Sequence, residues 1–471
     1  MQAETPVISA FVSTQPSAPT IPPAVRFPGQ IKYIIGNEAC ERFSYYGVLG
    51  ILELYLKDRM KMGDAGATEV VHYFGTAVYF LPLFGGWLAD RFLGRYWTIL
   101  SISLFYCLGH GCMAAFGETR AGLFCGLSLL AIGAGGIKPC VSAFVGDQFG
   151  PQEDRALTKV YAWFYWAINL GAAFAFFAIP LVRREAGYKW AFGVPGLFMA
   201  LATVIFWLGR KKYIRQPPRR PSETVGLGRI FSYGLSRLGL WTNNLTSAQE
   251  NDAKAVWRIL MIFCTVPMFW ALFNQVNTTW VLQGNALTPA WRWNDQFLIN
   301  GESMQSAGAV LVMIWVPILT LVVYPALEKM GIIPTALRRM SAGMVLGAVA
   351  FVGSGLLQAQ LDHGAKLSIA WELIPYAFLE AGEVMLSATA LEFAFSQAPA
   401  GMKSIITSFW LMTISGGHFL VATFTSLNED YIHARGAAQF YLFAALMFVV
   451  AVVFIGCAVA YRPVESKTQS V

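Results

Sequence analysis

Long apolar stretches recur along the whole chain, and they constrain its fold more than any other feature of the sequence. A helix needs about 20 mostly apolar residues to cross a membrane, because no water in the hydrocarbon layer can satisfy unpaired backbone groups. Of the 471 residues, 56% are hydrophobic and 13% are charged, which is far more apolar than a soluble chain. We therefore predict an all-α membrane protein with twelve transmembrane helices. The predicted spans are 31–56, 68–89, 96–116, 121–145, 157–181, 190–209, 256–283, 303–326, 337–359, 369–395, 404–426 and 437–461.

The longest segment between predicted spans divides them into two sets of six. This segment opens with three basic residues and continues through QPPRRP, so we predict a plain tether, although 229–241 has the apolar spacing of a surface helix. Two six-helix bundles joined by a basic loop are typical of the major facilitator fold. The predicted parts are a disordered cytoplasmic tail (1–29), an N-terminal bundle (30–209), a cytoplasmic linker (210–255), a C-terminal bundle (256–461) and a cytoplasmic tail (462–471).

The distribution of charge predicts the orientation in the membrane. Residues 1–29 lack an apolar core, so we expect no signal peptide there. Most of the 34 Lys and Arg residues fall in segments on the same side as the two tails. The positive-inside rule then puts both termini in the cytoplasm, and we expect a multi-pass protein of the cell inner membrane. The net charge of +7 indicates contact with anionic lipid, not with nucleic acid.

The seven cysteines nearly all fall inside predicted spans, without paired spacing or accompanying histidines. We interpret them as small buried hydrophobic residues, and we expect neither a disulfide framework nor a metal site.

Charged residues inside the first predicted span are the strongest functional signal. An ionisable side chain at bilayer depth costs about 2.5 to 3.5 kcal/mol, so it indicates function by default. Glu38, Glu41 and Arg42 share one helical face. Two carboxylates beside one guanidinium leave a negative charge in excess, which a proton or a cation can relieve. A static ion pair is the alternative, but it would not need the second acid.

Four motifs resemble those of the proton-dependent oligopeptide transporter family. NEACERFSYYG in the first span is similar to the family's ExxERFxYYG signature. GAGGIKPCVSAFVGDQF, FYWAINLGA and AGEVMLSATALEFAFSQAPAGMKS follow in the family's order, and GGWLADRFLGRY resembles the signature of the wider superfamily. The resemblance covers about 30 to 460. It implies a bacterial-type secondary transporter, not an enzyme, that imports di- and tripeptides by proton symport and alternating access, with the proton as coupling ion and no cofactor.

The resemblance also implies which residues form the site. The candidate proton-coupling residues are Glu38, Glu41, Arg42, His72 and Lys138. The candidate substrate-binding residues are Arg42, Tyr46, Tyr79, Lys138, Asn169, Trp270, Glu383, Ser387 and Trp410. In this assignment Arg42 and Lys138 bind the peptide carboxylate, and Glu383 receives the amine.

Several of these candidates have a structural alternative. Lys138 could snorkel, but it lies far from a helix end. His72 could be a buried neutral imidazole. The aromatic residues could be bundle packing.

These charges suggest a coupling hypothesis. In the empty carrier, Glu38 or Glu41 pairs with Arg42 or Lys138, and this pairing keeps the carboxylate ionised. The substrate carboxylate competes for the cation, so the displaced glutamate binds a proton. Peptide and proton then enter together.

Three residues depart from the family pattern. Leu49 and Asn274 stand where many members have a basic and an acidic residue, which form a salt bridge across the outer gate. We expect this gate to close by another contact; Glu53 is one candidate, although it could also snorkel. Gly308 stands where an Asn is common, which predicts the loss of one peptide-backbone contact.

Other functions remain open at this stage. A carrier of nitrate, another small anion or a peptidomimetic drug uses the same scaffold, and so does a non-transporting nutrient sensor. A membrane-embedded enzyme has no support, because the sequence contains no HExxH or GxSxG motif. We expect a monomer whose partners are peptides, protons and membrane lipid.

Overall fold

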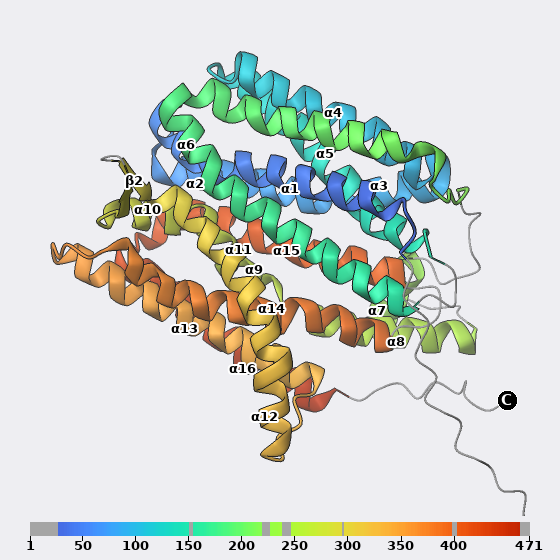
Figure 1. Cartoon of the computed structure of the whole chain (residues 1–471). Helices are drawn as coiled ribbons and strands as arrows, with labels where there is room; N and C mark the ends of the chain where they lie inside the picture. The colour runs from blue at the N-terminus through green and yellow to red at the C-terminus, as the bar shows by residue number, and fades with distance from the viewer. Residues whose placement is uncertain are drawn as a thin grey trace, which may run out of the picture.

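The computed structural model describes residues 27–149, 154–218, 227–237, 246–293, 296–397 and 403–461. The predictions for the two tails fall mainly outside these ranges. Helices dominate the described residues, and in Figure 1 most of them run roughly along one common axis, to which α11 and α12 are strongly inclined. We call the end where helix α1 begins and helix α6 ends the terminal end, and the opposite end the distal end.

The N-terminal half consists of helices. They are α1 (Ile31–Leu54), α2 (Gly63–Phe80), α3 (Pro82–Leu88), α4 (Gly94–Phe116), α5 (Arg120–Gly146) and α6 (Asp154–Leu208). The segment α6 is two helices that meet at Gly187, where φ is +80° and ψ is 175°. An L-residue with a Cβ rarely adopts this conformation, so the glycine permits the turn between the predicted fifth and sixth spans.

The C-terminal half is more broken. Its helices are α8 (Ser247–Phe263), α9 (Pro267–Phe273), α10 (Thr279–Ala286), α11 (Gly301–Ile318), α12 (Tyr324–Lys329), α13 (Ala336–Asp362), α14 (Leu373–Gln397), α15 (Lys403–Leu427) and α16 (Ala437–Ala460). A hairpin of β1 (Ala290–Trp293) and β2 (Gln296–Ile299) pairs antiparallel at the distal end. The single predicted span at 256–283 is interrupted, because Pro267 begins α9 and a 3₁₀ turn, Asn274–Asn277, precedes α10.

Each half has its own hydrophobic core. One buried cluster extends from Ile31 to Tyr213, and a second extends from Ile230 to Phe454. Tyr79 packs against both. In Figure 1 the blue-to-green half lies above the yellow-to-red half, with α1, α2 and α6 facing α11 and α15. The interface between the halves therefore consists of these helices.

Seven described helical segments are long and apolar enough to cross a membrane. Two of them, Gly63–Phe116 and Lys159–Lys211, have 54 and 53 residues, and each contains two of the predicted spans. The predicted spans at 31–56, 369–395 and 404–426 are not among the seven. The first two carry the acidic residues of the candidate site, which reduce their hydropathy.

The linker contains more structure than a tether. Helix α7 (Leu227–Arg237) buries Ile230 and Tyr233, and a Cβ added to Gly234 would lie 2.3 Å from the ring of Trp257. The prediction of a plain tether is therefore wrong here, because the apolar face of α7 packs on α8. Residues 238–241 of the expected surface helix lie outside the described residues. Helix α8 also begins inside the expected linker, at a capping box formed by Thr246 and Gln249.

Many large apolar side chains are exposed on the outer surface of the bundles, as expected for helices in contact with lipid. All seven cysteines are free. The prediction that they are buried is wrong for Cys125 and Cys264, which are exposed, because one face of a spanning helix contacts lipid instead of protein.

The superfamily motif forms a polar contact at the terminal end. Gly94 adopts φ +73° and begins α4. Arg95, in the first turn of α4, pairs with Asp147 after α5 and lies 3.8 Å from Asp90. The motif therefore ties the loop after α3 to the end of α5.

The turn at Gly187 provides a test of the fold. Replacing Gly187 with Ala imposes backbone strain of about 1–3 kcal/mol, so the apparent melting temperature in detergent should fall. The matched control is Gly111→Ala on α4, where a Cβ meets nothing within 4 Å and helix propensity favours Ala. Equal melting temperatures for the two variants would contradict the described turn.

Candidate functional site

The carboxylates and the guanidinium of α1 form one buried cluster. Arg42 Nε lies 2.6 Å from Glu38 Oε1 and 3.0 Å from Glu41 Oε2. Both carboxylates are at most 2% exposed. The other oxygen of Glu41, Oε1, is buried without a hydrogen-bond partner among the described residues. One cation is therefore shared by two acids, and one acid has unused hydrogen-bonding capacity.

Helix α5 adds a second cation to this cluster. Lys138 Nζ lies 4.0 Å from the ring centroid of Tyr45 and 5.5 Å from that of Tyr79. It is within electrostatic range of Arg42 and both glutamates, and within the described chain it has no hydrogen-bond partner. Aromatic faces stabilise a desolvated ammonium without neutralising it. Lys138 therefore remains available to an anion.

The C-terminal half contributes an acid. Glu383 on α14 hydrogen-bonds to Ser387, one turn later, and its Oε2 is buried without a partner in the described ranges. Tyr46 of α1 interacts electrostatically with both Arg42 and Glu383. A cation of one half and the carboxylate of the other thus lie within electrostatic range of the same tyrosine.

The remaining candidates occupy different positions. Asn169 on α6 donates from Nδ2 to the carbonyl of Tyr165 at 3.0 Å. Trp270 and Trp410 form an edge-to-face pair with centroids 5.8 Å apart inside the C-terminal core. Tyr79 lies on the interface between the two halves. The tryptophans therefore pack on each other in this conformation, whereas Tyr79 packs against the cores of both halves.

Gly308 makes room for a residue outside the candidate set. A Cβ at Gly308 on α11 would lie 2.5 Å from Oε1 of Glu380. Glu380 is 3% exposed and stands three residues before Glu383 on α14. The glycine that departs from the family pattern thus accommodates a buried carboxylate next to the site.

His72 does not join the charged cluster. Its Nδ1 lies 3.0 Å from Nδ1 of His418 on α15, and its Nε2 lies 3.1 Å from Oγ1 of Thr278. The structure therefore separates the proton-coupling candidates into two groups, Glu38, Glu41, Arg42 and Lys138 in one and His72 in the other. Sequence reasoning missed His418, although an ionisable residue within a predicted span is the same signal that identified Lys138.

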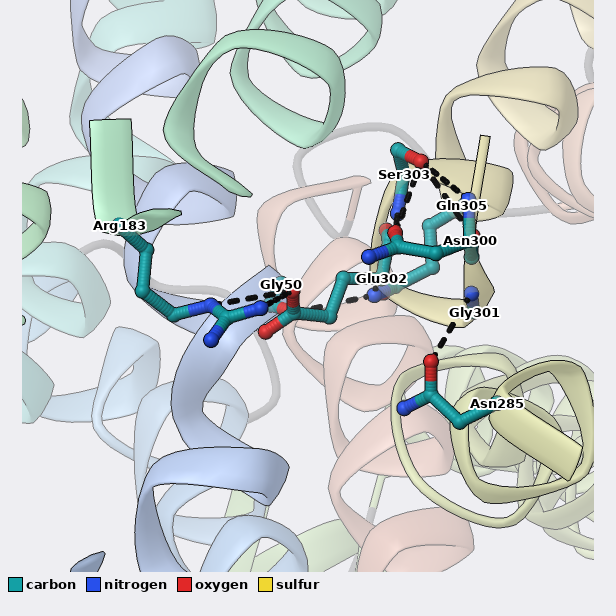
Figure 2. Close-up of polar contacts among 8 residues, drawn as sticks. All are labelled: Gly50, Arg183, Asn285, Asn300, Gly301, Glu302, Ser303 and Gln305. Carbon is teal, nitrogen blue, oxygen red and sulfur yellow. Dashed lines mark hydrogen bonds and ion pairs between the residues drawn. The ribbon is translucent and has the colours of Figure 1, made fainter. Parts of the chain in front are cut away.

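The halves are also joined at the distal end by an ion pair (Figure 2). Arg183 of α6 donates from Nε and Nη2 to Oε2 of Glu302 on α11, with the Nε contact at 3.1 Å. Gln305, one turn further along α11, donates to the carbonyl of Gly50 at 3.2 Å. Sequence reasoning missed this pair, because both charges stand at the ends of predicted spans, where charged residues are ordinary.

Leu49 and Asn274 are both buried and form no ion pair. Glu53 is one candidate for a gate contact; its carboxylate accepts a hydrogen bond from Thr68 within the same half at 2.9 Å, and no hydrogen bond or ion pair among the described residues joins it to the other half. It does not snorkel either, since it is 0% exposed. The Arg183–Glu302 pair joins the halves close to Leu49, since Gln305, one turn from Glu302, donates to the carbonyl of Gly50.

Two helical bundles around a buried charged cluster define a polytopic membrane protein of the major facilitator type. The chain matches the model of the POT family over residues 96–232 and 230–439, and it belongs to that family. The predicted family and fold are thereby confirmed.

Several relatives resemble the chain closely. It is 35% identical over 365 residues to Solute carrier family 15 member 2 of Rattus norvegicus, covering 71% of this chain and 50% of that protein. A crystal structure of an auto-inhibited POT family peptide transporter matches with a TM-score of 0.83 and 37% identity, covering 94% of this chain and 99% of that one. The crystal structure of the POT family transporter PepTSo matches with a TM-score of 0.84 and 36% identity, covering 93% of this chain and 99% of that one. The chain spans about half the length of the curated relatives it matches.

The distal ion pair can be tested by a double-mutant cycle. Arg183→Met leaves the fully buried Glu302 carboxylate unpaired, which destabilises by about 3–5 kcal/mol when a buried partner is removed. The double variant Arg183→Met with Glu302→Leu should recover much of that loss, as measured by thermal unfolding in one detergent. Arg339→Met is the matched control, because its partner Glu392 is 61% exposed and such pairs contribute about 0–1 kcal/mol. Additive losses in the double variant would show that the two residues act independently.

Proposed function

We propose that this protein imports di- and tripeptides by proton symport and alternating access. One observation carries the proposal: Tyr46 lies within electrostatic range of both Arg42, in the N-terminal half, and the buried carboxylate of Glu383, in the C-terminal half. A second buried cation, Lys138, lies within electrostatic range of Arg42. A zwitterion is the ligand whose two ends match this arrangement. A single small anion would leave Glu383 without a role.

The length of a short peptide suits such a site. The charged ends of an extended dipeptide are up to about 7 Å apart and those of a tripeptide about 11 Å. Its carboxylate would bind Arg42 and Lys138, its ammonium would bind Glu383, and Asn169 would hydrogen-bond to its backbone. Because these contacts involve groups present in every peptide, we expect broad side-chain specificity. Tyr46, Tyr79, Ser387 and the Trp270–Trp410 pair would line the side-chain pockets.

The shared cation supports a coupling mechanism. Arg42 contacts both Glu38 and Glu41. A substrate carboxylate that binds Arg42 weakens its contact with the glutamates. A desolvated carboxylate without a cation takes up a proton, and Glu41 is the candidate because Oε1 already has no partner. The proton would be the coupling ion, with no cofactor.

Alternating access requires the distal contacts to open. The Arg183–Glu302 pair joins α6 to α11, and its separation would admit substrate from the distal side.

We propose that this side faces away from the cytoplasm and that the protein is a monomer of the cell inner membrane with both termini inside. Cation–π contacts of Lys32 and Lys212 with Tyr33, at 5.2 and 5.7 Å, and of Arg210 with Trp207, at 3.5 Å, support this orientation, because basic and aromatic residues gather at the cytoplasmic headgroups.

The role of Glu383 predicts a change in substrate discrimination. Glu383→Gln should weaken dialanine uptake or binding about tenfold or more, because hydrogen bonds to charged groups contribute about 1.5–3 kcal/mol. For N-acetylated dialanine, which has no ammonium, Glu383→Gln should weaken uptake or binding far less. Counterflow of labelled dialanine in proteoliposomes, with each compound as competitor, measures both effects. Glu392→Gln on the same helix is the control, and it should behave as wild type. An equal loss for both compounds would remove Glu383 from ammonium recognition and would favour an anion carrier.

The proposed role of Glu41 predicts that its substitution impairs proton-driven accumulation of peptide but not peptide counterflow. Glu41→Gln cannot release and rebind the proton, so accumulation driven by a pH gradient should fall about tenfold or more. Counterflow, which needs no net proton movement, should persist. Full gradient-driven accumulation by Glu41→Gln would refute the assignment. A nutrient sensor that does not transport would show neither activity in wild type.

A further inference from the structure

Two histidines from opposite halves of the protein meet inside the interface. His72 lies on α2 and His418 on α15, with their Nδ1 atoms 3.0 Å apart and their ring centroids 5.1 Å apart. The two residues are 0% and 1% exposed. Thr278, in the turn before α10, occupies the other ring nitrogen of His72. The pair therefore bridges the two bundles at a position separate from the Glu38–Arg42 cluster.

The surrounding residues hold His418 in place. A Cβ added to Gly75 on α2 would lie 2.4 Å from Cε1 of His418, so only glycine leaves room for the ring there. Tyr79 stacks on the same ring, with centroids 5.8 Å apart and planes 20° apart. Next to His418, Ser415 donates to the carbonyl of Thr76 at 2.9 Å. The imidazole is thus seated in a site made by α2, one turn from its histidine partner.

The number of protons on the pair decides whether it can bond. In the neutral pair, one Nδ1–H donates to the lone pair of the other Nδ1. One additional proton is taken up at the Nε2 that has a free lone pair, and the bond between the rings is retained. A second additional proton can bind only at the accepting Nδ1. Both Nδ1 atoms are then donors and both rings are cationic, so the contact is lost.

The nearby titratable groups do not offset a second charge. On α2, Tyr79 faces His418, and Glu69 stands three residues before His72 in an acidic setting with Glu429 and Asp430. From α5, Lys138 lies over the ring of Tyr79. From the C-terminal half, Thr278 contacts His72, and Trp270 packs close to Gly417, the residue before His418. In the described parts of the chain, no carboxylate bonds to either imidazole.

We propose that His418 is a second proton-binding residue of the transport cycle, which shares one proton with His72 while the halves are in contact and which releases the α2–α15 contact when both rings are protonated. Acid on the distal side would then favour opening toward that side and would load the carrier with protons. The proposal rests on the proposed symport for its transport consequences, but the opening of the contact does not depend on any substrate.

Hydrogen exchange tests the opening directly in the intact protein in lipid nanodiscs. After correction for the intrinsic pH dependence of exchange, lowering the pH from about 7.5 to about 5.5 should raise exchange in the distal parts of α2 and α15 about fivefold or more in wild type. His418→Gln, which retains hydrogen-bonding groups but cannot take up a proton, should lose this response. Gly75→Ala, which displaces the ring without removing an imidazole, should lose it too.

A third buried histidine provides the matched control. His110 bonds to Ser44 at 2.6 Å within the N-terminal half and does not reach the interface. His110→Gln should therefore keep the acid response of α2 and α15. An acid response that survives in His418→Gln and Gly75→Ala, or that is absent in wild type, overturns the proposal.

Transport assays separate this proposal from the proposed function. His418→Gln should keep dialanine counterflow within about twofold of wild type, while accumulation driven by a pH gradient falls about tenfold. Counterflow also establishes that the variant is folded. Unchanged gradient-driven accumulation overturns the role of His418 in coupling. If wild type shows the acid-dependent exchange but no dialanine counterflow, the histidine contact is supported and the peptide assignment fails.

Discussion

The structure depends on the need to neutralise charges that the membrane cannot solvate. Arg42 pairs with both Glu38 and Glu41, and the aromatic rings of Tyr45 and Tyr79 contact the ammonium of Lys138. Every such charge depends on its neighbours for stability. A ligand that brings its own charges can therefore replace a protein partner at small net cost. This exchange of partners is what allows a buried cluster to serve as a binding site and as a proton acceptor.

The polar contacts between the halves are physically linked to that cluster. The Arg183–Glu302 pair and the His72–His418 pair join helices of opposite bundles. Tyr79 connects the histidine pair with the cluster, because its ring stacks on His418 and also lies under Lys138. A change in the position of Lys138 on substrate binding would therefore be felt by a residue that packs on the interface. Tyr79 is therefore a contact residue of both the central site and the interface between the bundles.

The departures from the family pattern follow the same rule of pairing. Leu49 and Asn274 are both uncharged, and Arg183 and Glu302 are both charged and pair with each other. Leaving one member of either pair would place an uncompensated charge at the interface. Gly308 is explained in a similar way, since the space that a side chain there would need is occupied by Glu380. Each of these residues can be explained only together with its partner, because taken alone it removes a charge or a side chain.

The sequence by itself determined the helical membrane fold, the division into two halves and the charged residues of α1, α5 and α14, because a long apolar stretch and a charge within it are local features that membrane physics makes rare. It did not determine the interruption of the seventh span, the packing of α7, or the exposure of Cys125 and Cys264, which depend on neighbouring helices. Only the tertiary structure brought His72 to His418 and Arg183 to Glu302. These partners lie 346 and 119 residues apart along the chain. A local sequence pattern does not reveal how two bundles are placed relative to each other. Local chemistry thus identified which groups are unusual, while the packing of one half against the other decided which of them meet.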